Sequence, residues 1–238
     1  MQVDCRWEAI IDCIARLHVS PLSAAGARQV DRRARVRMTD LVSILIPAYN
    51  SARWLEECVG SALAQTWPRK EIIIVDDGSK DDTLAVARRF ECPTVKVVTQ
   101  ANGGAPAARN HALRLAQGDY IQWLDADDVL HPQKIELQLS AGARERSTRT
   151  LLTSAWGKFF FRTAKASFEP DSLWQDHSPI GWILTRFSDN VWMNPAPWLM
   201  SRQLSDLAGP WDARLAKSGD DDGEYICRVA AASDAVRF

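Results

Sequence analysis

The sequence predicts an α/β fold built on a mostly parallel, twisted sheet that is flanked by helices. Four short apolar runs, rich in Val and Ile, alternate with stretches of helical periodicity between residues 42 and 124. Parallel strands need a crossover between them, and a helix in each connection supplies it. Polar residues follow closely after three of the runs. Ligands of open parallel sheets bind at the carboxyl ends of the strands, so this pattern predicts one nucleotide-sized crevice there.

The first half of the chain supplies the regular elements in order. The predicted strands cover residues 42–46, 71–75, 95–99 and 120–124. The predicted helices cover residues 55–63, 83–90 and 106–116. In the first of these helices, apolar side chains recur at helical spacing, at Leu55, Cys58, Val59, Ala62 and Leu63. We therefore expect a Rossmann-like nucleotide-binding half over residues 41–130.

The second half, residues 131–238, is less regular. The expected elements are a helix over residues 132–146, strands over 151–156 and 158–163, and a short helix over 203–208. Six of the ten tryptophans fall between Trp156 and Trp211. Most of these rings are expected in the core, although such rings are also suited to stacking against sugar faces. We interpret this region as an irregular acceptor-binding half.

The composition excludes several classes of protein. The net charge of −1 gives no basic field for nucleic acid. No apolar run is long enough to span a bilayer, and the first residues lack the pattern of a signal peptide. The five cysteines are widely spaced and include no Cys-x-x-Cys pair, which disfavours a zinc site or a disulfide framework. These features favour a reducing, cytoplasmic setting.

Residues 1–40 are predicted to be a poorly ordered extension ahead of a domain at residues 41–238. Residues 25–37 are basic and lack a sustained apolar period. An arm for nucleic acid or a membrane surface is the alternative to a disordered leader, and we favour the leader. Met38 stands just before the first strand, so the residues before it are a candidate non-native extension. N-terminal sequencing of the natural product would test this hypothesis.

The acidic run after the last predicted strand is the most informative motif. Asp125 and Asp127 alternate along an extended chain and so face the same way, and Asp128 follows directly. Two carboxylates with open positions beside them suit a hard divalent cation, Mg²⁺ or Mn²⁺, whose other ligands are phosphate oxygens. The alternative is a cluster of helix N-caps in a strand-to-helix loop.

Two further loops carry candidate ligands for a nucleotide. Asp76 and Asp77 end the second strand, where a carboxylate can accept from a base N–H or a ribose hydroxyl; a turn with a helix cap is the alternative. Asn102 and Gly103 open a Gly-bearing loop that enters a helix, and a helix start favours an anion. Arg109 lies on the first turns of that helix and is a candidate contact for a diphosphate or a base.

A third acidic cluster precedes the last predicted helix. Asp220, Asp221 and Asp222 are consecutive there. Their charges would stabilise a helix N-terminus, which is the simpler interpretation. The functional interpretation is that one of them is a general base that accepts a proton from an attacking hydroxyl.

Taken in order, these motifs resemble those of family 2 glycosyltransferases. The matching stretches are VSILIPAYN, IIIVDDGSKDDT, NGGAPAARNHAL, GDYIQWLDADD and GPWDARLAKSGDDDGEYICR. They run from Val42 almost to the end of the chain. The resemblance implies the GT-A type of nucleotide-diphospho-sugar fold. It also implies inverting transfer of a sugar from such a donor, with a UDP-sugar as the first expectation, to a hydroxyl of a glycan, a lipid-linked molecule or another acceptor.

The resemblance assigns roles to individual residues. The residues expected to bind the donor are Pro47, Ala48, Tyr49, Asp76, Asp77, Asn102, Gly103, Arg109, Asp125 and Ala126. Asp125 and Asp127 are the expected metal ligands, for Mg²⁺ or Mn²⁺. Counting back from Arg228 to the family's Glu-Asp pair places Asp222 as the expected catalytic base, with Asp221 as the second choice.

The sequence also departs from the family pattern in two ways. It lacks the Gln-x-x-Arg-Trp motif and the membrane helices of many polymerising members, which argues against a processive synthase. It ends at Phe238, where similar proteins usually continue. The alternative function is therefore a truncated, catalytically weak module that binds a nucleotide sugar. Peripheral association with the inner face of a membrane is compatible with either interpretation, and a nucleic-acid partner is not expected.

Three other enzyme classes fit less well. An Asp-x-Asp-Gly phosphatase needs two spaced acids, whereas Asp76 and Asp77 are adjacent. A sugar-nucleotide pyrophosphorylase needs a Gly-rich basic loop after the first strand, where this chain has Pro-Ala-Tyr-Asn. A dinucleotide-binding dehydrogenase needs Gly-x-Gly-x-x-Gly, and residues 42–50 contain no glycine.

Overall fold

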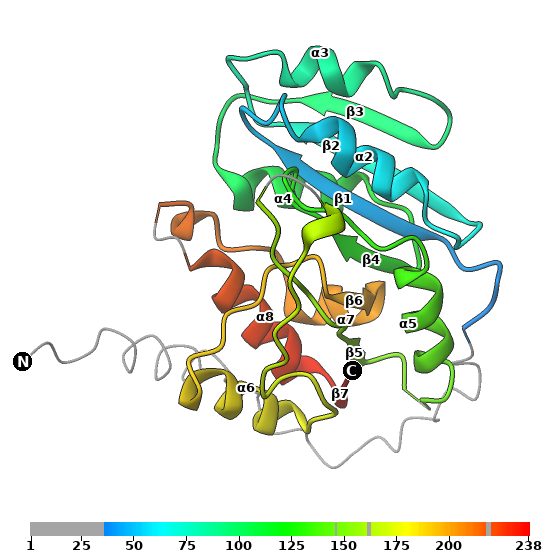
Figure 1. The fold of residues 1–238 in the computed structure, drawn as a ribbon, viewed down its shortest axis with the longest axis vertical. Helices are drawn as coiled ribbons and strands as arrows, with labels where there is room; N and C mark the ends of the chain where they lie inside the picture. Colours follow the sequence, from blue (N-terminus) through cyan, green and yellow to red (C-terminus); the bar gives the residue numbers. More distant parts are fainter. Residues whose placement is uncertain (1–35, 146, 161–162, 218–219) are drawn as a thin grey trace, which may run out of the picture.

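The computed structural model describes residues 36–145, 147–160, 163–217 and 220–238 (Figure 1). Most of the predicted N-terminal extension therefore lies outside the described residues. Of that extension, residues 36–40 form a turn, closed by hydrogen bonds between Arg37 and Asp40. The indole of Trp67 donates to the carbonyl of Asp40, so this turn packs on the domain.

The first half forms the parallel part of the sheet. Its strands are β1 (Val42–Ala48), β2 (Lys70–Asp76), β3 (Val95–Thr99) and β4 (Tyr120–Trp123). All pairings among these four strands are parallel, as predicted. Every residue of β1 is buried, as expected for a central strand that is covered on both faces. The carboxyl ends of β1, β2 and β4 therefore meet at one edge.

The second half completes a seven-stranded sheet. Its strands are β5 (Thr150–Leu152), β6 (Leu199–Ser201) and β7 (Ala235–Arg237). The strand order is β3-β2-β1-β4-β6-β5-β7. β6 runs antiparallel to β4 and β5, whereas β7 runs parallel to β5. The sheet is therefore mostly parallel, as the sequence predicts, with one reversed strand near its middle.

Helices cover both faces of the sheet (Figure 1). The α-helices are α2 (Leu55–Leu63), α3 (Thr83–Arg88), α4 (Ala105–Leu115), α5 (Lys134–Gly142), α6 (Pro179–Ser188), α7 (Arg202–Ala208) and α8 (Asp221–Ala232). Residues alternating along β1 divide between two cores, because successive side chains of a strand point to opposite faces. One core packs on α4, α6, α7 and α8, and the other packs on α2, α3 and α5.

Of the strand predicted over residues 158–163, the described residues 158–160 and 163 form none. Lys158 makes only an isolated bridge to Ser167, with two backbone hydrogen bonds of 2.9 Å, and a short 3₁₀ helix, η1, covers Thr163–Lys165. Phe160 is 84% exposed. An apolar run becomes a strand only where a neighbouring strand and a core face are available, and this loop has neither. The strand predicted over residues 151–156 is shorter, since pairing covers only β5.

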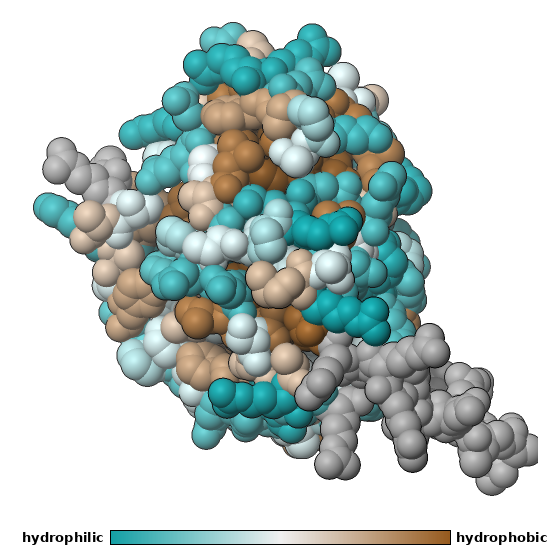
Figure 2. All heavy atoms as spheres, turned by 90° about the vertical axis from the view of Figure 1, so that its right-hand side faces the viewer, coloured by the Kyte–Doolittle hydropathy of each residue, from teal (hydrophilic) through white to brown (hydrophobic). Residues whose placement is uncertain are grey.

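Three of the six tryptophans between residues 156 and 211 lie in the core and Trp192 is 54% exposed, so the expectation that most of them are buried holds for only half. Trp182, Trp198 and Trp211 are almost fully buried. No helix within the described parts of the chain is long and apolar enough to cross a membrane. Figure 2 shows hydrophobic residues in patches separated by hydrophilic ones on the face that it presents.

Candidate active site

A pocket of about 510 Å³ lies at the carboxyl ends of β1, β2 and β4, where the sequence predicts a crevice. The start of α4 forms its remaining wall. Of the predicted site residues, the pocket is lined by Pro47, Ala48, Tyr49, Asp77, Asn102, Arg109, Asp125, Ala126 and Asp127. Four segments far apart in the sequence therefore meet in one cavity. Asp76, Gly103, Asp221 and Asp222 are not part of its lining.

Asp77 organises the Gly-bearing loop. Its carboxylate accepts hydrogen bonds from the backbone N–H groups of Gly103 and Gly104, at 2.9 and 2.8 Å. The side-chain amide of Gln100 donates to the same carboxylate at 2.7 Å. The anion favoured at the start of α4 is thus supplied by the protein itself. Gly104 has φ 86°, a conformation that favours glycine at this N-cap position.

Asp76 and Asn102 hold the neighbouring backbone. Asp76 is buried, and its carboxylate accepts from the Thr99 hydroxyl at 2.8 Å and from the N–H of Ser79 at 3.3 Å. The amide of Asn102 donates to the carbonyl of Asp77 at 2.9 Å. These bonds fix the strand-to-loop turn of β2 beside the pocket.

Arg109 joins the two acidic clusters. Its guanidinium donates to Asp125 and to Asp221, both at 2.7 Å, and lies 2.9 Å from Asp222. The side chain is only 4% exposed. Burial opposes its charge, but the surrounding carboxylates outweigh burial and raise the pKa of Arg109. The structure therefore brings together the strand end with the Asp-x-Asp motif and the first turn of α8.

A tryptophan fixes the position of this guanidinium. Arg109 stacks on the ring of Trp211, 4.3 Å from its centroid, and that ring stacks in turn on Tyr225 at 4.0 Å. The side chain of Asn110 forms two hydrogen bonds of 2.8 Å with the backbone N–H and C=O of Trp211. Two adjacent residues of α4 thus have complementary roles: Arg109 makes the ion pairs, and Asn110 holds the Trp211 ring on which Arg109 stacks.

These motifs match known proteins. The family model described as "Glycosyl transferase family 2" matches residues 43–151. Residues 43–151 of the chain carry a family 2 glycosyltransferase domain. Over 123 residues, 51% of the chain, it is 42% identical to a chondroitin synthase of Escherichia coli and 39% identical to a hyaluronan synthase of Pasteurella multocida. These alignments cover 18% and 13% of the two relatives, so the chain spans much less than their full length.

Solved structures share the fold of this family 2 domain. S. aureus TarS 1-349 in complex with UDP superposes with a TM-score of 0.67 at 22% identity, covering 82% of this chain and 56% of that one. The mannosyltransferase PcManGT from Pyrobaculum calidifontis, in complex with GDP-Man and Mn2+, superposes with a TM-score of 0.59 at 19% identity. That match covers 97% of this chain and 60% of the other. The fold is of the GT-A type, as the sequence resemblance implies.

Burial raises the pKa of two carboxylates near the site to about 7. Burial is the main cause for Asp222, and Asp125 and Asp221 add to it although Arg109 opposes them; the result is a pKa of about 7. Burial with the charges of Asp125 and Asp127 likewise raises the pKa of Asp128 to about 7. A carboxylate with a pKa near neutrality is better matched to proton transfer than an ordinary one.

The geometry at Asp222 also suits a proton acceptor. Its Oδ1 lies 2.9 Å from Arg109 without the geometry of a hydrogen bond. That oxygen has no hydrogen-bond partner within the described parts of the chain. This oxygen therefore keeps its capacity to accept a hydrogen bond, in addition to its ion pair with Arg109.

The residues present are compatible with a divalent cation at the Asp-x-Asp motif. Asp125 and Asp127 both line the pocket, and one oxygen of Asp125 is taken by Arg109. Across residues 36–145, 147–160, 163–217 and 220–238, no three His, Cys, Asp or Glu side chains are grouped to hold a metal. The protein would thus supply few ligands, which fits an ion that is also bound by phosphate oxygens.

The sequence did not identify three residues that support the site. Asn110 and Trp211 hold Arg109 in place, and Asn194 donates to Asp128 at 2.6 Å. Asn110 directly follows Arg109, so its position on the same helix turn was the only available signal. Trp211 stands in the stretch GPWDARLAKSGDDDGEYICR, which was its only signal, whereas nothing in the local pattern of Asn194 distinguishes it from other residues of the irregular half.

Proposed function

We propose that this family 2 domain binds a nucleotide-diphospho-sugar and transfers its sugar to an acceptor hydroxyl with inversion. The observation that carries the proposal is the ion-pair network of Arg109, which holds Asp125 and Asp222 in one site. A donor-binding strand end and a candidate base are thereby adjacent. Related structures contain UDP, UDP-GlcNAc or GDP-Man, and a UDP-sugar is the first donor we expect here.

In this proposal the pocket residues bind the donor. Pro47, Ala48 and Tyr49 line the side next to β1 and are assigned to the base. Asp77 acts by ordering the loop of Asn102 and Gly103, because its carboxylate is already bonded to the loop. Asp76 supports the same turn from below. Arg109 positions carboxylates rather than pairing mainly with the diphosphate, since its three ion pairs are all with Asp side chains of the protein.

Asp125 and Asp127 would hold Mg²⁺ or Mn²⁺. When bound, such an ion neutralises the charge that develops on the leaving nucleoside diphosphate. Arg109 restrains Asp125 from behind, at 2.7 Å, so the strand end presents its carboxylates in a fixed orientation. Ala126, between them, is small and buried, which leaves room for the donor beside the two acids.

Asp222 is the proposed general base, with Asp221 as its neighbour on Arg109. Asp222 removes the proton of the acceptor hydroxyl as that oxygen bonds to the anomeric carbon. The bond from this carbon to the diphosphate breaks, and its electron pair leaves with the nucleoside diphosphate. Attack from the face opposite the leaving group inverts the configuration. A module that only binds nucleotide would have no use for a carboxylate with this environment, so we favour the enzyme.

Binding of UDP to the Asp127→Ala variant tests the proposal. UDP should bind the wild-type protein more tightly in Mn²⁺ than in EDTA, and the variant should lose most of that difference because a metal ligand is missing. Isothermal titration calorimetry in the two buffers measures the effect. Asp206→Ala is the matched control, since Asp206 is exposed near the opposite edge of the sheet. Equal weakening in Mn²⁺ and in EDTA would refute the metal role of Asp127.

A further inference from the structure

A second cavity, of about 750 Å³, lies between α2 and the loop that follows β5. Asp128 lines this cavity, whereas Asp127, one residue earlier, lines the nucleotide-sized pocket. The two cavities are therefore adjacent at the acidic end of β4. None of the roles assigned above uses the second cavity.

One wall of the second cavity is made of small residues. Gly60 and Ala64 lie four residues apart on α2 and so share a face of the helix. A Cβ atom added to Gly60 would meet nothing within 4 Å. The space beside Gly60 is thus open, and a longer side chain there would fill it.

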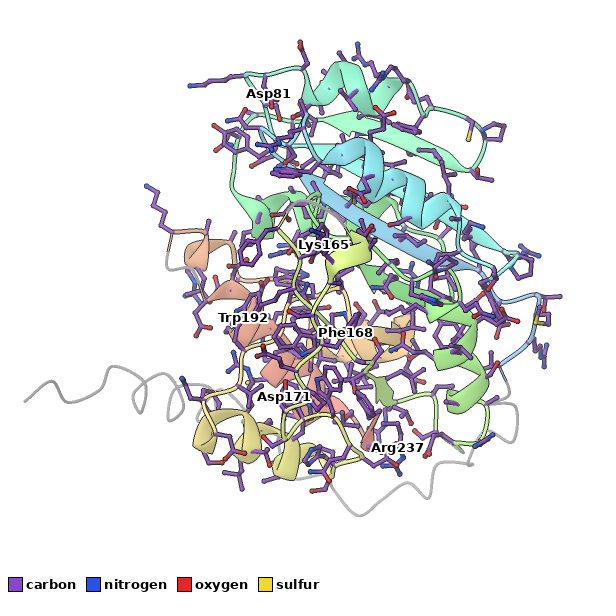
Figure 3. All side chains as sticks on the ribbon, viewed as in Figure 1. Asp81, Lys165, Phe168, Asp171, Trp192 and Arg237 are labelled. Carbon is purple, nitrogen blue, oxygen red and sulfur yellow. The ribbon has the colours of Figure 1, made fainter. Side chains whose placement is uncertain are left out.

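The opposite wall is aromatic. Trp156, Phe159 and Phe168 line it, on the loop in which Lys158 and Ser167 pair. Figure 3 labels Phe168 on this loop, where the chain crosses in front of the sheet. Trp156 is held edge-on by Trp192, with ring centroids 6.0 Å apart. Aromatic side chains that face the small residues Gly60 and Ala64 suit a ring-shaped ligand with apolar C–H faces.

Unmatched polar atoms lie among the lining residues. Asn194 donates its amide N–H to Asp128 at 2.6 Å, which leaves its Oδ1 without a hydrogen-bond partner in the described residues. The indole N–H of Trp156 also has no partner there. Both atoms are buried, so each would have to turn toward the cavity before it could pair with a hydroxyl group of a ligand.

The charges of the cavity disfavour an anionic ligand. Asp128 and Glu57 both line it. The buried ammonium of Lys134 is taken up by the side chain of Gln122 and by the carbonyl of Trp198. An anion would therefore meet two carboxylates against the one ammonium of Lys158, which lies 5.5 Å from the centroid of the Trp156 ring, whereas an alkyl chain would offer neither carboxylate a polar partner.

We propose that the second cavity is a subsite for a neutral sugar ring of the acceptor, one that holds the acceptor saccharide beside Asp128. The inference rests on the proposed glycosyltransferase function and adds the chemical class of the acceptor. The ring packs between Gly60 and the aromatic wall, and its hydroxyls donate to the carboxylates of Asp128 and Glu57, which line the cavity. An adjoining ring of the same saccharide then reaches the nucleotide-sized pocket.

Gly60→Leu tests this subsite by filling it. The probes are a neutral trisaccharide of N-acetylglucosamine, a neutral trisaccharide of glucose, a triuronate and decanol, each examined by saturation-transfer NMR. At least one neutral trisaccharide should bind the wild-type protein, and the leucine should weaken that binding by roughly tenfold or more because it occupies the ring's space. Gly60→Ala is the matched control, since one methyl group leaves most of the cavity open, and it should bind as the wild type does.

Binding of UDP with Mn²⁺ by the same three proteins separates the two hypotheses. If UDP binds all three equally while no neutral trisaccharide binds the wild type, or binds Gly60→Leu equally well, the subsite is refuted and the donor site stands. Preference for decanol or for the triuronate refutes the neutral-sugar assignment. If UDP fails to bind the wild type, the proposed function itself is wrong.

Discussion

The two halves of the sheet build their parts of the site in different ways. In the first half, seven-residue strands β1 and β2 pair in parallel along their whole length, and the ligand-facing residues sit where these strands end. In the second half, β5, β6 and β7 have three residues each. There the acidic turn of α8 is positioned by side chains, through Arg109 and the rings of Trp211 and Tyr225.

This difference shows which parts of a site depend on backbone and which depend on packing. A strand end holds its residues through ladder hydrogen bonds, so single side chains matter little to its position. The first turn of α8 depends on a few buried contacts with residues of α4. Changes to those contacts should therefore affect the acceptor side much more than the donor side.

The largest effect is expected from Arg109→Met, which removes the link between the halves. Asp125, Asp221 and Asp222 would face one another without a counter-charge, so we expect a loss of about 3–5 kcal/mol in the free energy of unfolding. Urea denaturation measures it. Arg89→Met is the matched control, because Arg89 pairs with Glu56 at the surface and such pairs contribute about 1 kcal/mol or less. A similar small loss in both variants would show that Arg109 does not hold the halves together.

The Asp222→Asn variant sharpens the comparison, since it changes the second half alone. Sugar transfer should fall by on the order of 10² to 10⁴, because the amide cannot accept the hydroxyl proton, while UDP binding stays unchanged. Single-turnover assays with a UDP-sugar and calorimetry give the two measurements. Asp220→Asn is the control, since that side chain is 63% exposed and lies 3.8 Å from Arg186. Near-normal transfer by Asp222→Asn would exclude it as the base, and Asp221 would be tested next.

The smallest expected effect is a change with pH in the contribution of Asp128, which follows β4, to the free energy of unfolding. Asp128 has a pKa of about 7 when folded, above its ordinary value of 3.8, so the folded protein keeps this proton longer than the unfolded chain. Its contribution to stability is therefore lost as the pH rises from about 4 to about 7. Asp128→Asn has no such proton and should be more stable than the wild type at pH 8, by on the order of 2 kcal/mol after allowance for solvent screening.

Urea denaturation of Asp128→Asn and wild type at pH 5 and pH 8, in EDTA, measures this effect. The advantage of the variant should shrink at pH 5. Asp206→Asn, at an exposed position, should show no comparable change between the two pH values. An advantage of Asp128→Asn that is independent of pH would mean that packing, rather than the charge of Asp128, is responsible.

The sequence predicted the first half well because its signals are local. Apolar runs with Val and Ile became β1, β2 and β3, and the acids after the strands came to one edge. The bonding of Asp77 to Gly103 was not foreseen, because a loop's amides can serve a ligand or a side chain equally well. Residues 158–160 show the opposite failure, since this apolar run found no neighbouring strand and only the isolated bridge of Lys158 to Ser167.

The link between Arg109 and Asp222 could not be predicted from spacing. Each residue lies near a helix start, which is a sufficient local explanation for it. Only the tertiary structure brings the guanidinium of Arg109 to 2.9 Å from the carboxylate of Asp222. The position of Trp211 under Arg109 has the same origin. Whether the roles assigned to individual site residues are correct stays a prediction, to be decided by the variants above.

The separation of these contacts along the chain has a consequence for folding. Arg109 bonds to Asp221 across 112 residues, and Asn110 bonds to Trp211 across 101. Contacts between such distant residues form late, since the chain must close a long loop before it gains them. On a ribosome, which releases the N-terminal half first, the nucleotide-sized pocket can take shape while α8 is still being synthesised. The carboxylates of α8 and the guanidinium that holds them would then come together in one of the last steps of folding.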